Sequence, residues 1–142
     1  MILCFLFMAG LAGAEPVKNS HVEAELVSDV ESIRPGEPFT MALRLKMDEH
    51  WHTYWINPGD SGLGARLTWT LPEGYEAGPL QWPYPQRIST PPFMTYGYEG
   101  EVFLLTTITP PSSGVTGKEV SFKAEVSWLA CKDVCMPGRA SL

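Results

Sequence analysis

Apolar and polar residues alternate along most of this chain, which is the pattern of β-strands with one buried face. The clearest run begins at Phe39 and ends at Met47, and a second run extends from Val120 to Trp128. In both runs every second residue is apolar, and most of the residues between them are polar or small. This pattern is typical of antiparallel strands that cover a core on one side and face water on the other.

Four further segments show a weaker alternation, at residues 22–27, 51–56, 65–71 and 102–108. Turn-forming residues separate the strands, at Pro35-Gly36, at 57–62 and at 110–114. No stretch has the spacing of an amphipathic helix, and the chain contains no internal repeat. About seven short strands with such turns predict an all-β fold, an antiparallel β-sandwich of the immunoglobulin-like type.

One region, residues 79–98, departs from this alternation because it is rich in proline and aromatic residues. Proline cannot donate a hydrogen bond to a central strand pairing, so we predict a loop or an edge here. Long loops that carry exposed aromatic residues often have a function. The alternative is a satellite hydrophobic cluster that covers one end of the sandwich.

The first fourteen residues have the features of a secretory signal peptide. An apolar run from Ile2 to Ala12 leads into Ala12-Gly13-Ala14, a small-x-small cleavage signal before Glu15. This run is too short for a membrane helix, which needs about 20 residues. We therefore predict a signal peptide over 1–14 and one exported domain over 15–142. Because a new alternating segment begins at 139–142, we also expect the sequence to be a fragment of a longer protein.

Charge and motifs exclude several classes of function. The net charge is −6 and no basic patch is present, so nucleic acid is not an expected partner. No serine–histidine–aspartate set, carboxylate pair or phosphate-binding loop suggests a hydrolase or a transferase. The remaining chemistry lies in the cysteines. Of the three in the chain, Cys4 falls in the predicted signal peptide, which leaves Cys131 and Cys135.

This cysteine pair is compatible with three kinds of site. Residues four apart in an extended chain are about 13 Å from each other, whereas a disulfide needs Cα atoms within about 7 Å. If Cys131 and Cys135 bond, residues 132–134 must turn, and Met136 onward must return as a partner strand. A disulfide that closes so short a loop stabilises the fold by only about 2 kcal/mol. A passive hairpin lock, common in exported proteins, and a labile bond used in thiol exchange both remain open.

The third possibility is a metal site. His50 and His52 alternate across Trp51, so both can point to one face of a strand. Together with the two thiolates and Met136 they would form a soft ligand set suited to copper(I). No spacing in the sequence requires these elements to meet, and a copper(I)-handling domain therefore remains an alternative.

Several segments together resemble one known family. The chain resembles the N-terminal periplasmic domain of DsbD-type thiol:disulfide interchange proteins, particularly the branch related to the copper-sensitivity suppressor ScsB. The similarity spans nearly the whole mature chain, and the last two segments in combination are fairly specific. The segments are residues 50–62, Gln81-Trp82-Pro83, Tyr96-Gly97-Tyr98-Glu99-Gly100 and residues 128–137 with both cysteines.

The resemblance implies a function as well as an immunoglobulin-like fold. In this family a transmembrane domain of the same protein supplies electrons to the N-terminal domain, which passes them to periplasmic thioredoxin-fold proteins. Cys131 and Cys135 would be the redox couple of a protein-disulfide reductase, with no cofactor. One thiolate would attack the partner's disulfide and the other cysteine would resolve the mixed disulfide. The expected location is the periplasm, with a tether to the inner membrane through regions beyond Leu142.

The resemblance also assigns a cap over the cysteine pair. In the family a cap loop shields the sulfurs from stray oxidants, and residues 92–98 match it here. This chain departs from the family pattern in two ways. Its cysteines are closer together in sequence than in the best-known members, and Pro91-Pro92 replaces the acidic residues that precede the aromatic residue of the cap. The site residues that the resemblance implies are Phe93, Met94, Tyr96 and Gly97 in the cap, and Tyr54 and His52 lining the cysteine pair.

The remaining alternative is a binding module. In that case the disulfide would be structural, and the domain would dock a partner through residues 79–98.

Overall fold

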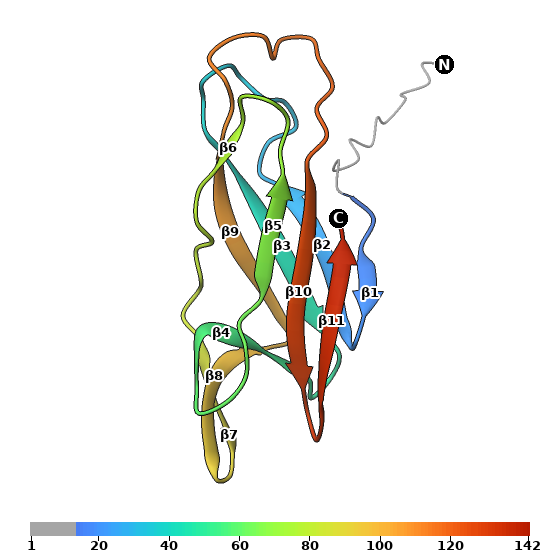
Figure 1. Ribbon diagram of the computed structural model, residues 1–142, viewed down its shortest axis with the longest axis vertical. Helices are drawn as coiled ribbons and strands as arrows, with labels where there is room; N and C mark the ends of the chain where they lie inside the picture. Colours follow the sequence, from blue (N-terminus) through green and yellow to red (C-terminus); the bar gives the residue numbers. More distant parts are fainter. Residues whose placement is uncertain (1–13) are drawn as a thin grey trace, which may run out of the picture.

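The computed structural model describes residues 14–142, which form eleven β-strands and no helix. The strands make two antiparallel sheets that pack face to face (Figure 1). All of the expected signal peptide except its last residue lies outside the described residues. Within the described part, no helix is long and apolar enough to cross a bilayer. The prediction of an all-β, immunoglobulin-like sandwich is confirmed.

Each sheet brings together strands that are distant in the sequence. The first sheet has the order β1 (Val17–Asn19), β2 (Val22–Ser28), β3 (Phe39–Met47), β9 (Glu101–Thr109) and β6 (Glu76–Ala77). The second has the order β11 (Cys135–Ser141), β10 (Lys123–Cys131), β4 (His52–Gly59), β8 (Phe93–Glu99) and β7 (Gln86–Thr90). In addition, β5 (Arg66–Thr70) pairs with the first half of β10.

Alternation predicted the strands of the core well. The observed bounds of β3 equal the predicted ones, and β9 alternates between buried and exposed residues over its whole length. Burial of these apolar faces is the main stabilising contribution, at roughly 25 cal/mol per Å² of apolar surface. The fully buried centre lies between the sheets and includes Val22, Leu43, Leu45, Leu104 and Ile108.

The strand predicted over 120–128 lies three residues further along the chain, at Lys123–Cys131. Residues 120–122, where the predicted strand began, lie outside the sheet. There the ring of Phe122 packs edge-on against two other aromatic rings. The ring centroids lie 5.8 Å from Phe39 and 5.3 Å from Tyr75. The strand ends at Cys131, which pairs with Cys135 and His52, so this cysteine belongs to the sheet and not to a loop.

The prediction of a loop or an edge over 79–98 holds as far as β7, which is an edge strand, and is wrong for β8. Residues 86–99 form the β7–β8 hairpin, in which β8 is an interior strand between β4 and β7. The prolines themselves obey the expected rule, because they precede β7 or lie in the turn at Pro91-Pro92. Trp82 packs against the core cluster, as the satellite-cluster alternative had proposed.

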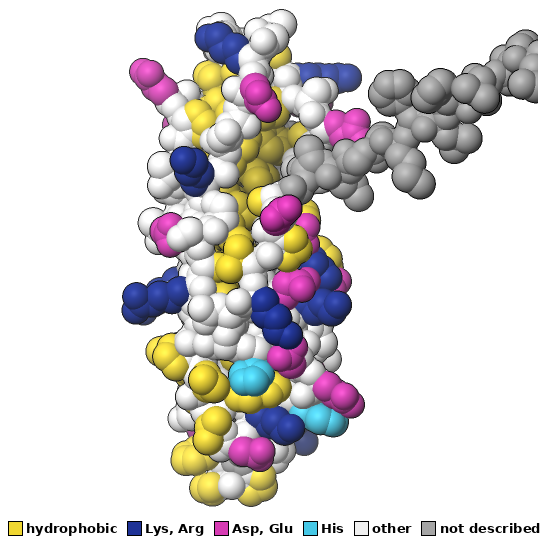
Figure 2. Space-filling view, turned by 90° about the vertical axis from the view of Figure 1, so that its right-hand side faces the viewer, with side chains coloured by type: hydrophobic (Ala, Val, Ile, Leu, Met, Phe, Trp, Pro, Cys, Tyr) yellow, Lys and Arg dark blue, Asp and Glu magenta, His cyan; other side chains and the backbone are white. Residues whose placement is uncertain are grey.

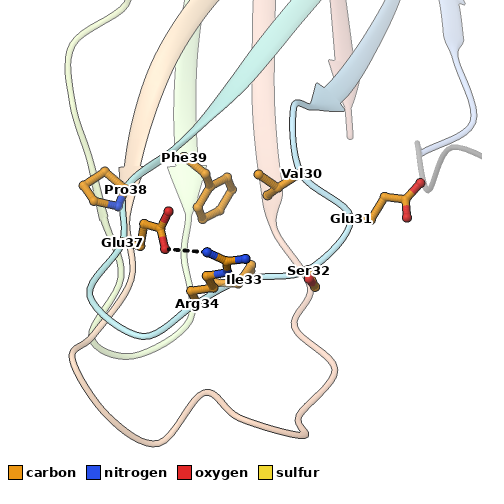
Figure 3. Close-up of a pocket in the computed structure, with 8 residues that line it drawn as sticks. All are labelled: Val30, Glu31, Ser32, Ile33, Arg34, Glu37, Pro38 and Phe39. Carbon is orange, nitrogen blue, oxygen red and sulfur yellow. Dashed lines mark ion pairs between the residues drawn. The ribbon is translucent and has the colours of Figure 1, made fainter.

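The fold places the cysteine hairpin and the largest loops at different ends. In Figure 1 the β7–β8 and β10–β11 hairpins point to the same end, and the β2–β3 connection lies at the other. A pocket of about 450 Å³ lies beside that connection (Figure 3), lined by eight residues of 30–39. Its Arg34–Glu37 ion pair spans 3.5 Å and is largely exposed. The lining contains no cysteine or histidine, so this pocket offers no redox chemistry.

Candidate functional site

The two cysteines lie opposite each other at the end of the β10–β11 hairpin. Cys131 is the last residue of β10 and Cys135 the first of β11, and the two are register partners. They form a disulfide with a Cα–Cα distance of 4.1 Å. The backbone N–H of Lys132 donates to the carbonyl of Val134 (3.1 Å) and closes the turn. The tight hairpin that the cysteine spacing requires is therefore confirmed.

The two cysteines differ in their exposure to solvent. Cys131 is only 2% exposed, because β10 runs between β11 and β4 and pairs with His52 on the β4 side. Cys135 is exposed, since β11 lies at the edge of its sheet. Its neighbours Val134 and Met136 are apolar and also exposed, at 62% and 40%. Of the two cysteines, Cys135 is thus the one that is exposed to a second protein.

Two side chains of β4, the strand next to β10, lie close to the disulfide. The hydroxyl oxygen of Tyr54 lies 3.9 Å from Cys135 Sγ, and Nε2 of His52 lies 3.2 Å from the same hydroxyl. Both side chains are buried. Burial raises the pKa of Tyr54. Burial lowers the pKa of His52, and the nearby Glu99 carboxylate opposes this only in part. Both groups are therefore uncharged at neutral pH.

Two glycines make room for this arrangement. A Cβ at Gly97 would overlap the carbonyl oxygen of Thr53, and a Cβ at Gly62 would overlap the ring of Tyr54. Gly97 pairs directly with Tyr54 in the β4–β8 register. Sequence reasoning assigned Gly97 to the cap and read Gly62 only as part of a turn. The φ of 104° at Gly62 agrees with a turn, but the contact of Gly62 with Tyr54 depends on the tertiary structure.

The expected cap residues all lie on β8. Because β4 separates β8 from β10, the two strands are about 10 Å apart. Phe93 is 48% exposed and Tyr96 is 37% exposed. Among residues 14–142, no hydrogen bond joins β8 to either cysteine; Gly97 approaches the site through Tyr54 instead.

An unexpected residue, Asp60, holds the start of β8. Its carboxylate accepts a hydrogen bond from the N–H of Met94 (2.8 Å), and its own N–H donates to the Met94 carbonyl (3.0 Å). Sequence reasoning missed this contact. The available signal was an aspartate in the polar connection at 57–62, a residue type that often bonds nearby backbone groups.

The histidines do not form the expected metal-binding face. His50 lies before β4 with a φ of 68°, is exposed and pairs with Glu49 at 3.3 Å. His52 is buried in β4 beside Tyr54. The expectation that both point to one strand face is wrong, because His50 lies in the turn before β4 and only His52 lies in the strand. In the part of the chain that the structure describes, no three His, Cys, Asp or Glu side chains gather as metal ligands.

Apolar side chains are exposed at the end of the molecule that carries the disulfide. Figure 2 shows hydrophobic side chains in the lower part, interspersed with charged and histidine side chains. The elements at this end carry several exposed apolar residues, namely Phe93, Tyr96, Val134 and Met136. Such a patch around a reactive group is typical of a protein interaction site.

Comparisons with solved structures concern the fold of the chain. The chain is similar in structure to the N-terminal periplasmic domain of ScsB from Proteus mirabilis, with a TM-score of 0.66 and 22% identity over 93% of this chain. It spans 49% of that ScsB chain, about half its length. The yeast GGA1 GAE domain matches less well, with a TM-score of 0.45 and 14% identity over 90% of this chain and 96% of the other. A comparison with curated protein sequences gives no match.

The family comparison is more specific than these structural similarities. Residues 19–142 match the family model described as "Thiol:disulfide interchange protein DsbD, N-terminal". This range includes all of the strands from β2 to β11 together with both cysteines. The chain belongs to the family of DsbD N-terminal domains, which are thiol–disulfide interchange domains.

Proposed function

We propose that this domain accepts electrons from a membrane-embedded domain of the same full-length protein and reduces disulfides of exported thioredoxin-fold proteins in the periplasm. Cys131 and Cys135 are the redox couple. The observation that carries the proposal is the unequal burial of a disulfide at the tip of a hairpin: Cys131 is 2% exposed and Cys135 is exposed. A disulfide with one accessible sulfur suits exchange with a second protein.

The electrons enter through the exposed sulfur. A donor thiolate attacks Cys135 Sγ, the bond to Cys131 breaks, and Cys131 leaves as a thiolate that takes up a proton. The donor's second thiolate then attacks the donor sulfur of the mixed disulfide and releases Cys135 as a thiolate. The donor is left with a disulfide and this domain with two reduced cysteines, so two electrons are transferred.

The same sulfur passes the electrons on. The Cys135 thiolate attacks the partner's disulfide and forms a mixed disulfide, and one partner sulfur leaves as a thiolate. Cys131, as a thiolate, then attacks Cys135 Sγ, re-forms the original bond and releases the partner with two reduced cysteines. The exposed apolar residues Val134 and Met136 flank Cys135 and provide surface on which a partner can dock.

The first test measures reduction and transfer directly. We expect the native domain to be reduced reversibly in a dithiothreitol or glutathione titration, because Cys135 is accessible. The reduced domain should then reduce an oxidised thioredoxin-fold protein with a Cys-x-x-Cys pair, one equivalent for one, as followed by thiol labelling. The double Cys→Ser variant is the control. A disulfide that stays oxidised in strong thiol while the domain is native would contradict the proposal and favour a structural disulfide.

The cap is the second part of the proposal. We propose that Phe93 shields the sulfurs from small oxidants, a role implied by the match of 92–98 to the family's cap. Two observations support this role: β8 lies at the same end of the sandwich as the disulfide (Figure 1), and the Phe93 side chain is exposed. Because β4 lies between β8 and β10, shielding requires the start of β8 to bend across β4.

Replacing Phe93 with alanine tests this role. Oxidation of the reduced cysteine pair by glutathione disulfide should become a few fold faster, since a small oxidant would reach Cys135 more often. Phe103→Ala is the matched control, because Phe103 is similarly exposed (40%) but lies on β9 in the other sheet. Equal oxidation rates in Phe93→Ala, Phe103→Ala and the unchanged protein would show that Phe93 does not shield the pair.

A further inference from the structure

The hydroxyl of Tyr54 connects the exposed sulfur to a buried imidazole. It lies 3.9 Å from Cys135 Sγ and 3.2 Å from His52 Nε2. The ring planes of His52 and Tyr54 meet edge to face, with centroids 5.1 Å apart and an angle of 78°. Both residues belong to β4, whose backbone is held on one side by Cys131 and on the other by Gly97. The three polar groups thus form a row in a fixed part of the sheet.

The chemistry of the disulfide decides the direction of these hydrogen bonds. Cys135 Sγ carries no hydrogen in the disulfide, so only the Tyr54 hydroxyl can donate in the contact between them. The tyrosine has one hydrogen, and its oxygen is then an acceptor toward His52. Nε2 of His52 must therefore carry the hydrogen in this arrangement. The row runs from the His52 N–H to the Tyr54 O–H to the sulfur.

We propose that this row of donors stabilises the thiolate of Cys135 once the disulfide opens. Tyr54 donates to the sulfur and is a catalytic residue, and His52 is a positioning residue that keeps the hydroxyl turned toward the sulfur. The proposal rests on the proposed function and extends it, since it explains how the exposed cysteine becomes the nucleophile. A hydrogen bond to an ionised acceptor is about twice as strong as one between neutral groups, and a chain of donors strengthens it further.

The charges near the site are compatible with a neutral donor chain. Burial lowers the pKa of His52, so that the imidazole is uncharged at neutral pH and keeps one N–H. Glu99 on β8 is the register partner of His52 and opposes this shift. Lys132 and Asp133 in the cysteine turn carry opposite charges and are both exposed. The hydrogen bond from Tyr54 is therefore the specific interaction available to the sulfur from the β4 side.

The test measures the reactivity of Cys135 alone, without a partner. The reduced protein is alkylated with iodoacetamide between pH 5 and 10, and modification at Cys135 is read by mass spectrometry. Trypsin cleaves after Lys132 and so separates the two cysteines into different peptides. Because iodoacetamide reacts with the thiolate, the rate reports how much of Cys135 is ionised at each pH.

Tyr54→Phe should slow alkylation of Cys135 at pH 7 by about tenfold, the value of one hydrogen bond to a charged group, and move the pH profile upward. Tyr98→Phe is the matched control. It also removes a buried tyrosine hydroxyl, but that hydroxyl donates to the carbonyl of Pro83 at 2.8 Å. Its profile should equal that of the unchanged protein. If Tyr54→Phe reacts like the unchanged protein at every pH, the proposal is overturned.

Two substitutions of His52 separate positioning from charge. Glutamine keeps a neutral N–H donor near the place of Nε2, so His52→Gln should react within about twofold of the unchanged protein, whereas His52→Leu should be about threefold slower. The double variant of His52→Leu and Tyr54→Phe should react like Tyr54→Phe alone, because His52 acts only through the hydroxyl. Additive effects, or a His52→Gln variant as slow as His52→Leu, would overturn the role of His52.

The outcomes also distinguish this proposal from the proposed function. Transfer of electrons to a thioredoxin-fold protein can succeed while Cys135 alkylation is unaffected by Tyr54→Phe, and then only the donor chain is wrong. If His52→Leu does not fold, Tyr54→Phe and His52→Gln still decide the question, because both nearly keep the shape of the original side chain.

Discussion

Replacing Cys131 with serine is expected to trap a stable mixed disulfide between this domain and a thioredoxin-fold partner, whereas replacing Cys135 is not. The reason is the difference in burial: Cys135 is exposed and Cys131 is 2% exposed. In Cys131→Ser the accessible sulfur can attack and nothing resolves the product. In Cys135→Ser the remaining thiol is covered by β4 and β11, so attack requires local opening of the hairpin.

The rate of mixed-disulfide formation measures this asymmetry. We expect Cys135→Ser to react on the order of a hundredfold more slowly than Cys131→Ser, since opening of even a short segment costs a few kcal/mol. Non-reducing gel electrophoresis against time gives both rates with the same oxidised partner. Urea unfolding should abolish the difference, because both thiols are then exposed. Equal trapping rates in the native proteins would rule out Cys135 as the only entry point.

Gly97→Ala is expected to cause the largest loss of stability among single changes near the site. The new Cβ would overlap the carbonyl oxygen of Thr53, so β4 and β8 must move apart. Overpacking of this kind typically costs about 3 kcal/mol, which corresponds to a melting temperature roughly 10 °C lower. Because Gly97 pairs with Tyr54, the same movement should displace Tyr54 from Cys135.

Gly78→Ala is the control for this substitution. Gly78 also lies against a neighbouring strand, but a Cβ there would meet Thr107 O at 3.5 Å, an ordinary contact. Neither glycine has a positive φ, so backbone strain does not enter the comparison. Thermal unfolding followed by circular dichroism should show a change of less than about 1 kcal/mol for Gly78→Ala. A similar loss in both variants would mean that the contact with Thr53 is not the cause.

Alternation predicted the strands that have one face on the core, including the first half of β4 and most of β10, but it did not predict the β7–β8 hairpin. β3 and β9 alternate because each has one buried and one exposed face. In β8 the pattern is interrupted by Gly97, which is needed for close approach to β4. The proline-rich stretch before it also favoured a loop. The composition of 79–98 therefore suggested an irregular segment where the structure has a hairpin.

The residues of the candidate site were predicted in part. Cys131 and Cys135 followed from their number and spacing, and Tyr54 and His52 followed from the resemblance to a family. The contacts of Asp60 with Met94 and of Gly62 with Tyr54 could not be predicted, because they join residues on different segments. The expectation that His50 and His52 point to one strand face failed for a local reason, since His50 lies in a turn and β4 begins only at His52.

The sequence by itself determined that this protein is an all-β domain, with a cysteine pair whose spacing requires a tight hairpin if the two cysteines bond, because alternation and chain geometry are local properties. The sequence did not distinguish the two cysteines from each other. The tertiary structure distinguishes them, because the pairing of Cys131 with β4 buries this residue, whereas Cys135 is exposed at the sheet edge. The same pairing brings Tyr54 beside Cys135, a contact across 81 residues of sequence.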